Sequence, residues 1–233
     1  KTTVLTLVSI PIQMALLIYF GIELLNTPTL WANLSHIRAP FGISIILNLA
    51  HVAIFIPTLL VTWLSYLQWH TKKKKAPFIN TPMIQFLITG STLLLMSRDL
   101  STTLISIECI FLSIYGLLKP SPSCNRPVFQ FSLIGHIIST TLLIISTLLC
   151  YSAFGTLNFA DIYQTCLTQD TPTAGYITVS LITFSILIKL HTFPLHFWIP
   201  RVMKQSKPII NSIITAHLVQ PFSILLIQLL YIY

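Results

Sequence analysis

Two ionisable residues lie deep inside apolar segments of the chain. Lys189 lies a little past the middle of the apolar run from Gly175 to Pro200, and Glu108 lies near the centre of LSTTLISIECIFLSIYGLL. An ionised lysine at the middle of a bilayer costs about 2.5–3.5 kcal/mol on insertion scales, so it is rarely kept without a partner or a function. Pairing lowers the cost of both charges and couples their protonation. The pair is therefore a candidate for holding and passing a proton.

Two structural alternatives remain open for these residues. Lys189 has a long side chain that can snorkel to the membrane interface, although a long apolar stretch separates it from Arg201. A buried ion pair can also serve the fold alone, and such pairs often only break even in free energy.

Pro194 follows Lys189 closely and predicts a broken helix near 190–194. Proline cannot donate to the carbonyl of Leu190, and its ring clashes with that carbonyl. A break within the bilayer is tolerated where the backbone packs in protein or lines a hydrated cavity. His191 and His196 flank the proline and are candidates for lining a proton path, because histidine titrates near neutral pH.

The remaining histidines and the cysteines carry weaker signals. His136 and His217 each lie in an apolar segment, where a neutral imidazole bonded to a neighbour is the commoner case. The histidines do not supply the paired ligands of a haem, and His191 and His196 lack partners for zinc. The four cysteines show no metal spacing and are expected to be small buried residues: Cys109, Cys124, Cys150 and Cys166. We therefore expect no cofactor in this chain.

The composition is that of an integral membrane protein. Apolar residues make up 54% of the chain and charged residues only 8%, against roughly a quarter charged in soluble domains. The net charge of +8 comes from short basic tracts between apolar runs. Such tracts indicate membrane topology, so nucleic-acid binding is not expected.

Hydropathy predicts an all-α polytopic bundle of about seven spans in a single transmembrane domain, 1–233. The expected spans are 3–25, 41–69, 82–97, 100–118, 127–152, 174–193 and 208–231. The longest polar connection is 154–173. With seven spans, ten basic residues gather on one side of the membrane, namely Lys1, Lys72–Lys75, Lys119, Arg126, Arg201, Lys204 and Lys207. That side is expected to be the negative one.

Four segments, in order, resemble a known family. KLHTFPLHFWIPRV (189–202) resembles the K-L-x-x-x-P-x-H-F-W-x-P-x-V signature of chain 2 of NADH:ubiquinone oxidoreductase, an antiporter-like membrane subunit of respiratory complex I. SRDLSTTLISIECIFLSIYGLL is similar to its N-D-L segment, with Glu108 at the family's glutamate. Residues 133–162 resemble its G-x-x-x-S helix and the loop after it, and QPFSILLIQ resembles its A-P-x-S-I run. Residues 98–233 would then be the first half of the antiporter-like bundle, preceded by leading spans in 1–97.

The resemblance implies a function in proton transport. Family members carry protons across the membrane, driven by electron transfer elsewhere in the complex, and bind neither flavin nor iron–sulfur clusters. Lys189 matches the lysine on the first broken helix, and Glu108 matches its paired glutamate. The implied partners are the other membrane-arm subunits of complex I and the lipid bilayer.

The chain departs from the family pattern at several positions. The helix after the broken one lacks the family's second central lysine, and either His217 or Gln220 occupies its place. Gln130 lies near the position of another family lysine, before the G-x-x-x-S helix. A second, inverted set of helices is not present in these residues. We expect a separate polypeptide to supply it, and the alternative is that this half is lost.

Three functional hypotheses follow. The first is a proton-translocating subunit of mitochondrial complex I, with Glu108 and Lys189 as the relay and His217 passing the proton onward. The second is a structural subunit of the same complex without pumping activity, and the third is a cation/proton antiporter. A composition rich in Ile, Leu, Lys and Thr fits an A/T-rich organellar gene. The expected location is the mitochondrial inner membrane, with the N-terminus and basic loops on the matrix side.

Overall fold

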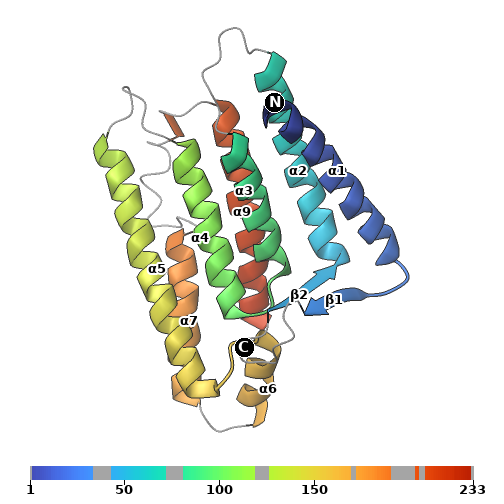
Figure 1. The fold of residues 1–233 in the computed structure, drawn as a ribbon. Coiled ribbons are helices and arrows are strands. Elements are labelled where there is room, and N and C mark those ends of the chain that lie inside the picture. The colour runs from blue at the N-terminus through green and yellow to red at the C-terminus, as the bar shows by residue number, and fades with distance from the viewer. Residues whose placement is uncertain are drawn as a thin grey trace.

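The computed structural model describes residues 2–33, 43–71, 81–118, 126–168, 172–189, 203–204 and 208–231. Its long helices run side by side as a bundle (Figure 1). They are α1 (Thr2–Glu23), α2 (Leu49–Thr71), α3 (Thr81–Met96), α4 (Leu100–Leu117), α5 (Arg126–Phe154), α7 (Pro172–Lys189) and α9 (Pro208–Tyr231). These helices correspond to the seven expected spans and confirm the predicted membrane-type helical bundle.

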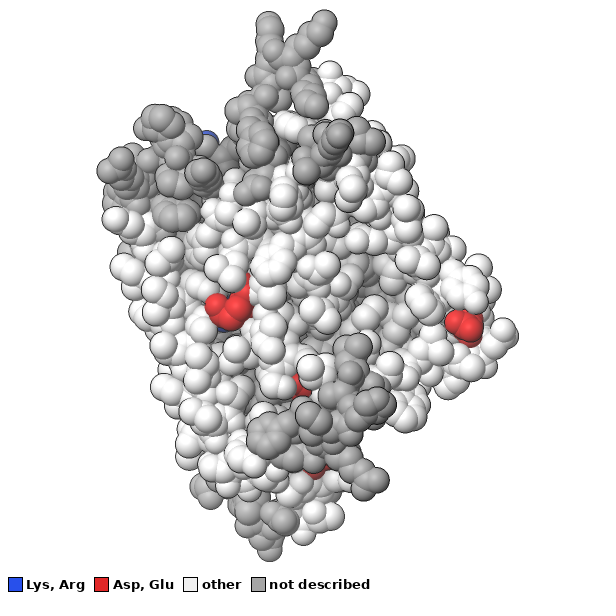
Figure 2. All heavy atoms as spheres, in the orientation of Figure 1, with Lys and Arg blue, Asp and Glu red and all other residues white. Residues whose placement is uncertain are grey.

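The outer surface of the bundle is apolar, as a lipid-facing surface must be. Five helices are long and apolar enough to cross a membrane, and α3 and the 175–189 part of α7 are shorter apolar helices. Leu5, Leu112 and Leu148 are each at least 60% exposed. On the face drawn in Figure 2, charged side chains appear at only a few isolated points among the described residues. Exposed apolar side chains on this scale indicate a bilayer environment.

Two elements lie at the end of the bundle opposite to the N-terminus (Figure 1). A hairpin of β1 (Thr29–Asn33) and β2 (Ser44–Asn48) connects α1 to α2, and the short helix α6 (Phe159–Thr168) connects α5 to α7. The strands are antiparallel, with Thr29 opposite Asn48 and Asn33 opposite Ser44.

These two elements correct the sequence-based boundaries. Hydropathy predicts a second span from residue 41, but 44–48 form β2 and the helix begins at Leu49. Two physical causes are visible: Ile45 and Ile46 are β-branched, and the Asn48 side chain caps the helix by accepting from the backbone N–H of His51 at 3.0 Å. The expected polar connection 154–173 likewise contains α6.

The start of α4 is held by a buried aspartate. Asp99, 1% exposed, is the N-cap residue and accepts from the backbone N–H of Thr102 at 2.7 Å. Its other carboxylate oxygen accepts from the backbone N–H of Ser44 at 3.2 Å. The backbone N–H of Leu100 donates to the carbonyl of Leu157, just beyond α5. The start of α4 is therefore tied to β2 and to the end of α5.

Small residues set the distances between helices that carry the candidate site. A Cβ at Gly90 of α3 would lie 3.1 Å from Cys109 and Ile110 of α4, and one at Gly175 of α7 would lie 3.2 Å from the ring of Phe154 of α5. Glycine thus permits close approach of α3 to α4 and of α7 to α5, as is common between membrane helices. Gly155 ends α5 with a positive φ of 68°.

The topology predicts opposite accessibility for two cysteines. Cys166 is exposed, so the expectation that it is buried is wrong; it lies on the short helix α6 at the end of the bundle. Cys124 is outside the described residues and belongs to the connection from α4 to α5, which the seven-span topology assigns to the other side. A membrane-impermeant maleimide should label Cys124 only from the side of the basic loops and Cys166 only from the opposite side. Burial raises the pKa of the Cys166 thiol, so its labelling should accelerate as pH rises. Cys150, 1% exposed, is the unlabelled control.

Mass spectrometry of the labelled chain in sealed membranes checks this orientation. Labelling of both cysteines from the same side would contradict the seven-span topology.

Candidate functional site

The structure brings Glu108 and Lys189 together inside the bundle. Glu108 lies at the middle of α4, and Lys189 is the last residue of α7, which ends part of the way along α5 (Figure 1). Nζ of Lys189 lies 3.2 Å from Oε1 of Glu108. This distance makes a charge-assisted hydrogen bond between residues 81 positions apart in the sequence.

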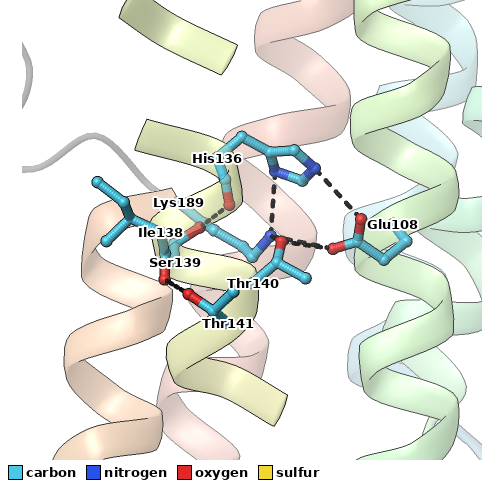
Figure 3. Close-up of polar contacts among 7 residues, drawn as sticks. All are labelled: Glu108, His136, Ile138, Ser139, Thr140, Thr141 and Lys189. Carbon is cyan, nitrogen blue, oxygen red and sulfur yellow. Dashed lines mark hydrogen bonds and ion pairs between the residues drawn. The ribbon is translucent and has the colours of Figure 1, made fainter. Parts of the chain in front are cut away.

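Two residues of α5 complete the cluster (Figure 3). Lys189 donates from Nζ to Oγ1 of Thr140 at 2.8 Å, and Thr140 donates from Oγ1 to Oε1 of Glu108 at 2.8 Å. His136 lies between the two charges, with Nδ1 3.1 Å from Nζ of Lys189 and Nε2 3.2 Å from Oε2 of Glu108. We call Glu108, His136, Thr140 and Lys189 the polar cluster.

The ionisable side chains of the polar cluster differ in burial. The lysine side chain is 0% exposed, the histidine side chain 11% and the glutamate side chain 30%. Full burial of an ammonium group is tolerated only when its protons find acceptors, and Lys189 has three within 3.2 Å. In this position the lysine does not snorkel to an interface. The structure thus excludes that alternative.

Aromatic rings cover one side of the polar cluster. The ring of Phe111 stacks on His136 with centroids 4.5 Å apart, and Nζ of Lys189 lies 4.8 Å from the Phe111 centroid. A cation above a ring face is attracted by the ring quadrupole. The Phe111 ring also meets Phe222 of α9 edge-on at 6.3 Å. Phe111 therefore fixes the imidazole plane and joins the polar cluster to α9.

His217, the expected onward relay, lies in a different environment. It is 0% exposed, with Nε2 2.9 Å from Oγ1 of Thr62 on α2 and Nδ1 2.8 Å from Oγ of Ser91 on α3. No hydrogen bond among the described residues joins it to Glu108 or Lys189. Two hydroxyl partners suit a neutral imidazole, and the onward role of His217 stays a prediction.

Other residues singled out from the sequence have varied positions. Pro194, His191 and His196 lie outside the described residues. Gln130, near the place of one missing family lysine, is exposed on α5. Gln220, the alternative to His217, has a buried Oε1 that lacks a hydrogen-bond partner within the described part of the chain.

Sequence reasoning missed His136 and Thr140 as members of the site. Their spacing carried a usable signal, because residues i and i+4 share one face of a helix. The segment HIIST thus presents an imidazole and a hydroxyl to the same neighbour. Which neighbour they meet depends on how α5 packs against α4 and α7, which the local sequence does not reveal.

Comparisons with known proteins show which family the chain resembles in sequence. Residues 97–233 match the family described as NADH:quinone oxidoreductase/Mrp antiporter, transmembrane. NADH-ubiquinone oxidoreductase chain 2 of Rhizopus oryzae is 32% identical over 133 residues, covering 56% of this chain and 25% of that protein. A polypeptide of the Na(+)/H(+) antiporter of Alkalihalophilus pseudofirmus is 23% identical over 190 residues, covering 79% of this chain and 38% of that protein.

Solved structures show the same fold. A chain of the archaeal membrane-bound sulfane sulfur reductase has a TM-score of 0.88 at 18% identity, covering 99% of this chain and 48% of that chain. A chain of respiratory complex I from Thermus thermophilus has a TM-score of 0.74 at 15% identity, covering 97% of this chain and 47% of that chain. The chain thus spans less than half the length of these relatives. On the match over 97–233, it belongs to the family of NADH:quinone oxidoreductase and Mrp antiporter membrane subunits.

Proposed function

We propose that this chain is a proton-translocating subunit in the membrane arm of a mitochondrial NADH:ubiquinone oxidoreductase. It takes part in an enzyme complex without carrying redox chemistry itself. Glu108 and Lys189 hold and release the proton, coupled to electron transfer in other subunits, and His217 receives it on the way across. The membrane is the mitochondrial inner membrane, with the basic loops on the matrix side.

One observation carries the proposal: a fully buried lysine whose only ion-pair partner among the described residues is a half-buried glutamate on another helix, 3.2 Å away. Each charge stabilises the other, so a change at Glu108 alters how tightly Lys189 holds its proton. Coupled ionisable groups of this kind are typical of functional sites. The likeness to chain 2 of Rhizopus oryzae supports assignment to complex I.

A cation/proton antiporter is the second candidate. The alignment with the Na(+)/H(+) antiporter polypeptide of Alkalihalophilus pseudofirmus covers more of this chain, 79%, than the alignment with chain 2, 56%. A structural component of complex I that does not pump remains the third hypothesis. It accounts less well for Lys189, because replacing a buried ion pair by apolar residues often leaves stability unchanged or higher.

Native electrophoresis of gently solubilised membranes separates the first two candidates. We expect the chain to migrate with NADH dehydrogenase activity, stained in the gel, and mass spectrometry of that band identifies the polypeptides beside it. The same band shows whether a second polypeptide with a lysine on a broken helix accompanies the chain. Migration away from the activity, together with sodium-dependent or potassium-dependent proton exchange, would favour the antiporter.

A further inference from the structure

The three protons of the Lys189 ammonium group match its acceptors in the polar cluster one to one. The ammonium group of Lys189 has three protons and three neighbours that accept: Oε1 of Glu108, Oγ1 of Thr140 and Nδ1 of His136. Because Nδ1 accepts, the imidazole is neutral and carries its proton on Nε2. Nε2 lies 3.2 Å from Oε2 of Glu108, and the Thr140 hydroxyl donates to Oε1.

We propose that His136 is a third proton-carrying residue of this site, exchanging a proton with Lys189 at Nδ1 and with Glu108 at Nε2. The inference deepens the proposed function and rests on it. Neither Lys189 nor Glu108 needs to change its heavy-atom position for this exchange, because each already lies within 3.2 Å of one ring nitrogen.

The exchange balances in atoms and charge. An N–H bond of Lys189 breaks as one forms at Nδ1 of His136, while the Nε2–H bond breaks as an O–H bond forms at Oε2 of Glu108. Lys189 becomes a neutral amine, Glu108 becomes a neutral acid, and the imidazole stays neutral in its other tautomer. The ring then donates from Nδ1 to the amine and accepts at Nε2 from the acid. In both end states each ring nitrogen therefore has a donor facing an acceptor across a distance of 3.1–3.2 Å.

The surroundings of His136 support a role in proton transfer rather than a purely structural role in packing. Among the described residues, the ring faces the charged groups of Glu108 on α4 and Lys189 on α7, and the phenol ring of Tyr115 lies 5.6 Å away, centroid to centroid. Stacking on Phe111 holds the ring plane so that its two nitrogens face the two charges. Thr140 bridges the same two groups, but an aliphatic hydroxyl does not take up or release a proton near neutral pH as an imidazole does.

Two substitutions of His136 in the assembled complex separate proton transfer from positioning. Glutamine offers a donor and an acceptor but cannot exchange protons between them, whereas leucine removes both. We expect His136→Gln to slow proton movement about 10²-fold, as far as His136→Leu does, because a positioned proton-transfer group contributes about 10²–10⁴-fold. Both variants should still assemble on native gels, so that proton movement is compared on intact complex. His70→Gln, a histidine at the end of α2, is the matched control.

Measuring Lys189→Met in the same assay tests the proposed function separately from the inference about His136. Normal pumping by His136→Gln with lost pumping by Lys189→Met would overturn the inference and leave the proposed function intact. Normal pumping by Lys189→Met would overturn both. If His136→Gln fails to assemble, infrared difference spectra of the wild-type complex with ring-¹³C histidine decide the matter. Tautomer-sensitive imidazole bands must change between the resting and NADH-driven states, and unchanged bands would overturn the inference.

Discussion

Lys189→Met is expected to leave NADH oxidation running while proton movement through this chain slows by about 10²-fold or more. Methionine is unbranched and close to lysine in length, so it fills the same buried space, but it carries no proton. The other proton acceptors and donors of the polar cluster remain in place. The measurement is the number of protons moved per NADH oxidised in sealed membrane vesicles that carry the variant complex.

Assembly should survive this substitution. Removing one partner of a deeply buried ion pair costs about 3–5 kcal/mol, because the other charge is left without compensation. Here Glu108 is 30% exposed and keeps its bonds to Thr140 and His136, so the cost should lie at or below the lower end of that range. Lys204→Met changes an exposed lysine outside the long helices and is the matched control. Unchanged pumping by Lys189→Met would remove the lysine from the proton path.

Glu108→Gln is expected to lower proton movement in the same direction and by a similar factor of about 10². Glutamine has the shape of glutamate but no charge, so Lys189 loses the only counter-ion that the described residues give it. The lysine must then either release its proton or remain as an unpaired buried charge, which costs about 3–5 kcal/mol. In both cases the lysine no longer alternates between two protonation states.

The same vesicle assay and native gel measure this effect and assembly together. Glu23→Gln at the end of α1 is the control, because that glutamate is exposed and belongs to no ion pair among the described residues. A Glu108→Gln variant that pumps normally would show that Lys189 works without its carboxylate partner.

The part of the fold governed by the bilayer could be predicted from the sequence. A span needs about 20 apolar residues, and the helices α1, α2, α3, α4, α5, α7 and α9 follow the apolar runs within a few residues except at the start of α2. The predicted start of α2 is wrong because Ser44–Asn48 is as apolar as a span while pairing with Thr29–Asn33. Pairing with a distant segment leaves no mark in local hydropathy.

The candidate site could be predicted only in part, because contacts between helices also leave no mark in the local sequence. Glu108 and Lys189 stand out because charge is rare in apolar segments, and the cost of burial favours bringing them together. His136 and Thr140 do not stand out, because histidine and threonine also occur in several of the other helices. Their function depends on which face of α5 meets α4 and α7, and the approach of α7 to α5 relies on close packing at Gly175.

The central claim is that Glu108 and Lys189 act as one unit in moving the proton. The most direct test is the double variant Glu108→Gln with Lys189→Met, measured as protons moved per NADH oxidised beside both single variants. The effects of substitutions in one network do not add. If the two residues act as one unit, the double variant should pump no less than the single variant with the lower pumping. Losses that multiply, each substitution reducing pumping by its own factor, would mean that the two residues act independently and would contradict the account.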